Sequence, residues 1–84
     1  MNSTHRKTLE IVFANPVKGN IEWRRIESML RALGCQVIEG SGSSVTFERE
    51  GLRATFHRPH AEKESLRYRI RDVRSFLEML GVKP

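Results

Sequence analysis

The chain has 84 residues, of which 38% are hydrophobic and 30% charged, and its formal net charge is +5. This length suits one domain and is too short for two, and the composition is ordinary for a soluble globular protein. No apolar run reaches about 18 residues and the start is not signal-like, so we expect a cytoplasmic protein that does not enter the membrane. Cys35 is the only cysteine, which excludes an intramolecular disulfide. We expect it to be a small core residue rather than a reactive thiol.

The excess of arginine indicates an anionic partner. Nucleic acid is the first expectation, an acidic protein the second and a membrane surface a distant third.

The first predicted element is a helix over residues 3–14. Ser3 or Thr4 is a plausible N-cap, and the apolar residues that follow have helical spacing. Asn15-Pro16 ends this helix, since the residue before a proline is pushed out of the α region. Residues 17–19 then form a linker, and we expect the helix to pack on the main body as an amphipathic lid.

The second predicted helix runs from a cap at Asn20, with Glu22 in its first turn, to Gly34. Its apolar stripe contains Trp23, Ile26, Met29, Leu30 and Leu33. Its opposite face contains Arg24, Arg25, Glu27, Ser28 and Arg31. That face is either solvated or in contact with nucleic acid.

Three short strands are predicted next, over residues 35–39, 44–48 and 52–57. The Gly/Ser loop at 40–43 separates the first two, and Glu50-Gly51 supplies a tight hairpin turn between the last two. In the third strand the apolar residues alternate with Arg53, Thr55 and His57, so one face of the sheet is predicted to be buried and the other polar and open.

A last helix begins at Leu66 and ends at Gly81, with an apolar stripe through Ile70, Val73 and Leu77. The order of elements predicts an α+β fold with the double-stranded-RNA-binding-domain-like α-β-β-β-α arrangement. Both helices pack on one face of a three-stranded antiparallel sheet, and one extra helix precedes them. We interpret residues 1–84 as a single domain, with an extension at 1–18 and a core at 20–82.

Arginines recur on one face of the last helix. Arg67, Arg71 and Arg74 have i, i+4, i+7 spacing, and Lys63 lies just upstream. Guanidinium groups bind phosphates bidentately, so the stripe suits an RNA backbone. The alternative is a solvated face that is partly paired with neighbouring carboxylates.

Two histidines lie at the end of the third strand, His57 as its last residue and His60 just beyond it. A neutral His57 or His60 can accept the proton of a ribose 2′-OH, and a nearby Arg53 or Arg58 would stabilise the developing negative charge. The alternative is two surface histidines at a strand end. Proline at position 59 and the lone cysteine argue against a zinc site, so we expect neither a metal nor another cofactor.

The remaining candidate contacts are backbone groups. Ser41 and Gly42 in the Gly/Ser loop offer N–H groups to a phosphate. Trp23, Phe47 and Phe56 follow the apolar patterns and are expected in the core, so recognition of RNA would rest mainly on backbone and shape.

Four stretches together resemble the HicA family of toxins: the helix from Asn20 to Gly34, the EGSGSSVTF turn, the FHRPH strand end and the RDVRSFLEMLGV helix. The resemblance covers Asn20 to the C-terminus and leaves the first helix as an extension. It implies an mRNA endoribonuclease with a fold similar to double-stranded-RNA-binding domains, neutralised by a HicB antitoxin.

One departure from the family pattern bears on activity. Members with an assigned catalytic histidine carry it as Gly-Ser-His, where this chain has Gly40-Ser41-Gly42, while the family's Pro-x-His pattern corresponds best to His60. Either His57 or His60 has taken over as base, or the protein is a non-catalytic RNA-binding module derived from a toxin. A third interpretation is a small protein-interaction domain whose basic helix docks an acidic partner.

Overall fold

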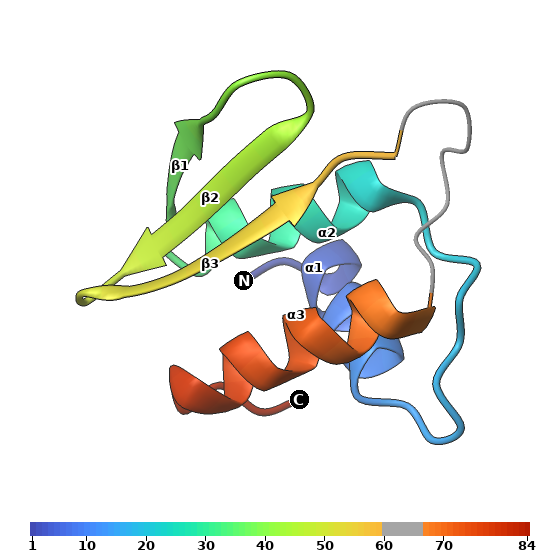
Figure 1. Cartoon of the computed structure of the whole chain (residues 1–84). Helices are drawn as coiled ribbons and strands as arrows, with labels where there is room; N and C mark the ends of the chain where they lie inside the picture. Colours follow the sequence, from blue (N-terminus) through green and yellow to red (C-terminus); the bar gives the residue numbers. More distant parts are fainter. Residues whose placement is uncertain (60–66) are drawn as a thin grey trace.

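The computed structural model describes residues 1–59 and 67–84 and contains the predicted order of elements. These are α1 (Ser3–Val12), α2 (Trp23–Ala32), β1 (Gln36–Glu39), β2 (Ser44–Arg49), β3 (Leu52–His57) and α3 (Arg67–Met79). The strands form one antiparallel sheet in the order β1-β2-β3 (Figure 1). The predicted α+β fold, with α-β-β-β-α after a leading helix, is therefore confirmed.

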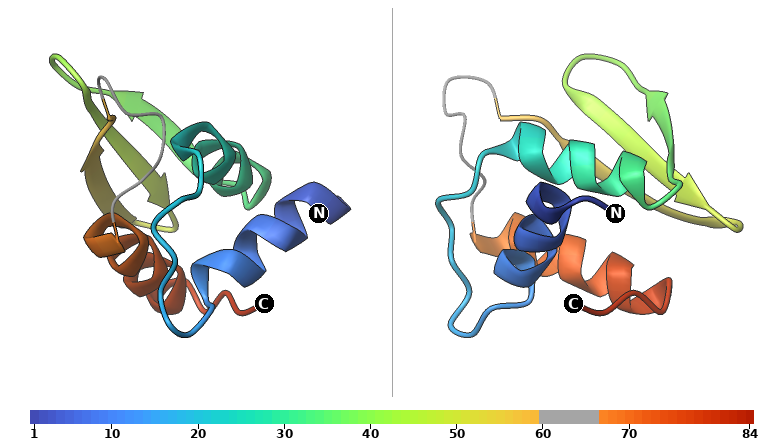
Figure 2. Two further views of the ribbon diagram at one scale, coloured as in Figure 1. Left: turned by 90° about the vertical axis from the view of Figure 1, so that its right-hand side faces the viewer. Right: turned by 180° about the vertical axis from the view of Figure 1, so that it is seen from behind.

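The helices α2 and α3 lie against one face of the sheet, and α1 packs against these two helices on the side away from the strands (Figure 2). At the centre of the core the Trp23 ring lies 5.5 Å from that of Phe56, which lies 6.1 Å from Phe47. The core around these rings consists largely of residues in the predicted apolar stripes and strand alternations, namely Leu9, Val12, Ile26, Met29, Leu30, Val45, Ile70, Val73, Phe76 and Leu77. α1 therefore shares the core of the helices it covers.

The turn and register of the hairpin follow from its sequence. Glu50 and Gly51 have φ values of 53° and 82°, the left-handed pair of a type I′ turn, which matches the twist of the flanking strands. This register buries Val45 and Phe56 as a cross-strand pair on the helix side. On the outer face Thr46 and Thr55 hydrogen-bond through their hydroxyl groups at 2.7 Å, so the predicted polar, open face is confirmed.

The C-terminal ends of α2 and α3 were predicted correctly. Gly34 has a φ of 89° and donates its N–H to Arg31, while the next N–H bonds to the carbonyl of Leu30. Gly81 repeats this Schellman arrangement at the end of α3.

The helix starts were predicted less well. The N-cap of α1 is Asn2, whose side chain accepts the N–H of His5 at 2.8 Å, and neither Ser3 nor Thr4. α2 begins at Trp23 instead of beside Asn20, because Ile21 is buried in a bend before the helix and Glu22, in an extended conformation, takes the N-cap position. Several residues near each helix start have side chains that can serve as an N-cap, so the residue types alone do not show which of them does.

Two further expectations concern the environment of Cys35 and the lack of a membrane-spanning helix. Cys35 is a buried core residue as predicted, and its burial raises the pKa of its thiol. Across residues 1–59 and 67–84, no helix has the length and apolar character needed to cross a bilayer.

Candidate nucleic-acid interface

One end of the sheet brings together the Gly/Ser loop and the end of β3. Ser44 pairs with His57 across the strands, and the backbone N–H of Arg58 donates to the carbonyl of Ser43 at 2.9 Å. Both segments lie at the same end of the sheet because β2 runs back between them (Figure 1). The histidine at the strand end is therefore a direct neighbour of the loop that contains Gly42.

The loop is closed by its own backbone. The N–H of Gly40 donates to Ser44 at 2.9 Å, and the N–H of Ser44 donates to Ser41 at 3.2 Å. A Cβ at Gly40 would lie 2.9 Å from the Ser44 hydroxyl, whereas a Cβ at Gly42 would meet nothing within 4 Å. Ser41 and Gly42 are both exposed at this end of the sheet.

His57 and Arg53 are both exposed on the open face of β3, as the alternation predicted. They are four positions apart, which in a strand corresponds to about 13 Å. A base and the group that stabilises charge must both reach one phosphate within hydrogen-bonding distance. The structure thus does not bring Arg53 to the same reacting group as His57.

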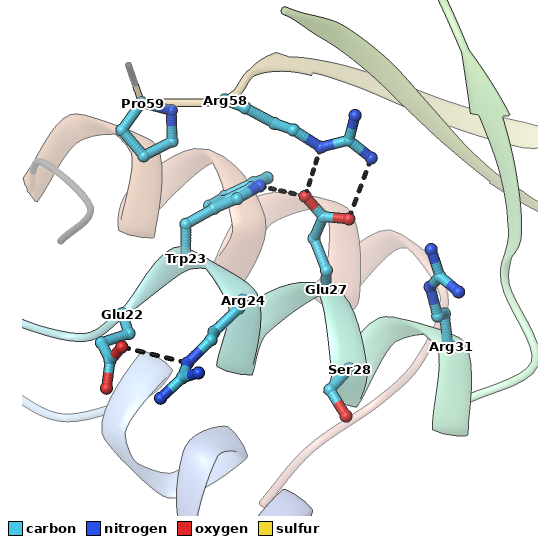
Figure 3. A pocket seen from close by; sticks show the side chains of 8 residues that line it. All are labelled: Glu22, Trp23, Arg24, Glu27, Ser28, Arg31, Arg58 and Pro59. Atoms are coloured by element: carbon cyan, nitrogen blue, oxygen red, sulfur yellow. Dashed lines mark hydrogen bonds and ion pairs between the residues drawn. The ribbon is translucent and has the colours of Figure 1, made fainter. Parts of the chain in front are cut away.

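Arg58 is committed to two carboxylates, and Figure 3 shows its bonds to one of them, Glu27. Its Nε and Nη2 donate to Glu27 on α2 at 2.7 and 3.1 Å, and its Nη1 and Nη2 donate to Glu39 on β1 at 2.6 and 2.9 Å. We call Glu27, Arg58 and Glu39 the arginine clamp. Four of the N–H groups of Arg58 are used in these bonds, so a phosphate would have to compete with both carboxylates for this side chain.

The electrostatics of the arginine clamp follow from these bonds. The hydrogen bonds to Glu39 and Glu27 raise the pKa of Arg58 above its ordinary value, and the bond from Arg58 lowers the pKa of Glu39. The Trp23 indole N–H also donates to Glu27, whose side chain is only 13% exposed. Glu27 was predicted on a face that is either solvated or in contact with nucleic acid, and in the structure it is the centre of this network.

A shallow pocket of ≈ 650 Å³ opens beside the clamp, and Figure 3 shows its lining. Arg24 and Arg31 stand exposed at its rim, and Arg24 pairs with Glu22 at 3.0 Å. The pocket therefore combines rim arginines with the Glu22 and Glu27 carboxylates, a mixed surface without one dominant charge.

The arginines of α3 divide into two groups. Arg67 and Arg71 are exposed, as predicted. Arg74 is only partly exposed, and its guanidinium donates to the carbonyls of Val12 and Ala14 at 2.9 and 2.7 Å. A third bond reaches the Asn15 side chain at 3.3 Å. Arg74 therefore holds the end of α1 on α3 and is less exposed than Arg67 and Arg71.

His60, Lys63 and Leu66 lie outside the described residues. Within the part of the chain that the structure describes, no group of three or more His, Cys, Asp and Glu side chains is arranged to hold a metal ion.

Sequence reasoning missed Tyr68. This residue is 53% exposed at the start of α3, so the expectation of little exposed aromatic surface needs correction. The signal was present: Tyr68 precedes Ile70 by two positions, which in a helix places it about 200° from the buried stripe.

Comparison with known proteins gives one match. A family model described as "HicA toxin of bacterial toxin-antitoxin" matches residues 23–82, which is more than half of the chain and includes α2, the sheet and α3. The match begins after α1. Neither the curated proteins nor the solved structures include one that matches this chain.

Proposed function

Because this chain belongs to the HicA family of toxins from bacterial toxin–antitoxin systems, we propose that it binds mRNA and cleaves it as a metal-independent endoribonuclease. We further propose that a HicB-like antitoxin neutralises it. An mRNA substrate gives the cytoplasm as the expected place of action.

The observation that carries this proposal is the position of His57 beside the Gly/Ser loop. Ser44 pairs with His57, and Gly42 lies two residues before Ser44. The family pattern implies a histidine at the position of Gly42. An imidazole on the neighbouring strand therefore supports the replacement of a missing base by His57, with His60 as the second candidate.

The proposed reaction uses the ribose of the substrate. The His57 imidazole accepts the proton of the 2′-OH, and the 2′-oxygen attacks the adjacent phosphorus. The bond from phosphorus to the 5′-oxygen breaks, which leaves a 2′,3′-cyclic phosphate on one fragment and, after protonation, a 5′-hydroxyl on the other. The backbone N–H groups of Ser41 and Gly42 are the proposed contacts for the developing negative charge, since Arg58 is engaged elsewhere.

Affinity for RNA is assigned to exposed cations on α3 and on the open face of the sheet. Arg67 and Arg71 on α3 and Arg53 on the open sheet face are exposed. We include Lys63 as a further phosphate contact. Such contacts are independent of sequence and weaken as salt rises.

The test is cleavage of a labelled RNA by purified protein with EDTA present. We expect fragments with 2′,3′-cyclic ends and a loss of rate of about 10²- to 10⁴-fold in His57→Ala, the usual contribution of a general base. His5→Ala on α1 is the matched control and should keep the parent rate. If His57→Ala, His60→Ala together still cleaves at the parent rate, neither histidine is the base.

A second candidate function has one specific observation in its favour. Glycine at position 42 removes the histidine that the family pattern implies, which favours a non-catalytic RNA-binding module that still captures an antitoxin. RNA binding without cleavage over long incubation would support this alternative, and Gly42→His should then restore cleavage.

A further inference from the structure

Tyr68 is a large aromatic side chain that the fold does not use. It is 53% exposed and lies outside the hydrophobic core, while Ile70 and Val73 on the same helix are completely buried. The guanidinium carbon of Arg69 lies 5.5 Å from the centre of the Tyr68 ring, within the range of a cation–π contact. A ring presented in this way is available to a ligand.

The surroundings of Tyr68 form a pocket. The linker between α1 and α2 and the start of α3 border an open hollow of ≈ 860 Å³, with Lys18, Asn20, Arg67 and Tyr68 among the lining residues. The described lining carries two cations, Lys18 and Arg67, and no carboxylate. In this it differs from the pocket beside the arginine clamp, which is lined by two glutamates.

This combination matches the chemistry of single-stranded nucleic acid. Successive bases stack on aromatic side chains, and cations beside the aromatic group bind the backbone phosphates. A protein partner would be favoured by an apolar or mixed-charge rim, whereas the charged side chains among the described lining residues are both positive.

We propose that the pocket between the α1–α2 linker and α3 binds one nucleotide of single-stranded RNA. Tyr68 stacks on the base, and Lys18 and Arg67 contact the flanking phosphates. This site deepens the proposed function and rests on it. It adds base stacking to a recognition that would otherwise depend on backbone and shape.

The location fits a substrate that continues to the sheet end. The linker, the first turn of α3 and the end of β3 lie along the same side of the molecule in both views (Figures 1 and 2).

The experiment measures binding of two uncleavable fluorescent oligodeoxynucleotides of about ten nucleotides by anisotropy. One is an oligodeoxyadenylate, and the other has the same phosphates with abasic tetrahydrofuran residues. Tyr68→Ala should weaken binding of the oligodeoxyadenylate by roughly 5- to 150-fold and leave the abasic oligomer unaffected, since stacking needs a base. Tyr68→Phe should keep the parent affinity. Arg67→Ala should weaken the binding of both oligomers and lower by about 1 the slope of log affinity against log salt concentration.

Met79→Ala is the matched control, because Met79 is 60% exposed at the other end of the same helix. Met79→Ala should leave the affinity for both oligomers unchanged. Tyr68→Ala should have the same midpoint of thermal unfolding as the parent, which shows that it is folded. If the parent binds the oligodeoxyadenylate and Tyr68→Ala binds it equally well, the Tyr68 site is refuted alone. If the parent binds neither oligomer nor RNA, the proposed function is refuted with it.

Discussion

Replacement of Arg58 by alanine tests how strongly the arginine clamp stabilises the fold. The side chains of Arg58 and Glu27 are 30% and 13% exposed. Exposed pairs contribute about 0.2–1 kcal/mol, whereas loss of one partner from a buried pair costs about 3–5 kcal/mol. Glu27 is close to the buried limit and Arg58 is intermediate, so we expect Arg58→Ala to lower the free energy of unfolding by about 2–3 kcal/mol. For a domain of this size the midpoint of thermal unfolding should fall by roughly 8–24 °C.

The chain supplies a matched control for this experiment. Arg24 pairs with Glu22 at 3.0 Å, but its side chain is 82% exposed, so Arg24→Ala should cost less than about 1 kcal/mol. Addition of Glu27→Gln to Arg58→Ala should recover part of the loss, because the variant amide oxygen still accepts the Trp23 N–H without leaving a buried charge. Urea unfolding of the four proteins measures these differences. Equal costs for Arg58→Ala and Arg24→Ala would refute the burial argument.

Four other outcomes are expected. Arg74→Ala should lower the free energy of unfolding by about 1.5–3 kcal/mol and speed amide hydrogen exchange in α1. Arg71→Ala should change the free energy of unfolding by less than about 0.5 kcal/mol and weaken RNA binding. The reverse pattern would contradict the assignment of these two arginines. Because burial raises its pKa, Cys35 should resist alkylation near pH 8 in the native protein and react in urea. Because Arg58 lowers the pKa of Glu39 below 4.5, the stability that Glu39 adds over Glu39→Gln should be present above about pH 4.5 and vanish at lower pH, as unfolding across pH would show. Gly42→His should raise the rate of RNA cleavage. Gly42 has a φ of 62°, in the left-handed region that histidine enters more often than most residues, and a Cβ added there would meet nothing within 4 Å. An unchanged rate would count against the loop as the catalytic position.

Most of the fold was predictable because the apolar residues of its helices and strands recur with clear helical or alternating spacing. The stripe through Trp23, Ile26 and Leu30 fixes one buried face of α2, and the alternation around Phe47 and Phe56 fixes one face of the sheet. Gly34 and Gly81 mark helix ends because few other residues take a left-handed conformation. The N-caps were missed, because several polar residues compete near each helix start.

The site was predictable only in part, for a reason that the arginines illustrate. A sequence pattern gives the face on which an arginine lies but not the acceptor that its guanidinium finds. Arg58 meets carboxylates from α2 and β1, and Arg74 meets carbonyls at the end of α1. These partners are between 19 and 62 positions away in the chain, so no local pattern reveals them.

Because Arg58 is bound to Glu27 and Glu39, other groups must supply the affinity of the proposed RNA site. A guanidinium held by two carboxylates adds little net attraction for phosphate at the sheet end, so affinity there must come from other groups. The exposed Arg67 and the Tyr68 ring are at the start of α3. If the substrate is anchored at α3 and only its reacting ribose reaches His57, substitutions of Arg67 or Tyr68 should raise KM with little change in kcat. Substitution of His57 should lower kcat and leave KM nearly unchanged. Kinetics of RNA cleavage separate these two effects, and a fall in kcat for Tyr68→Ala alone would place the stacking site in the chemical step.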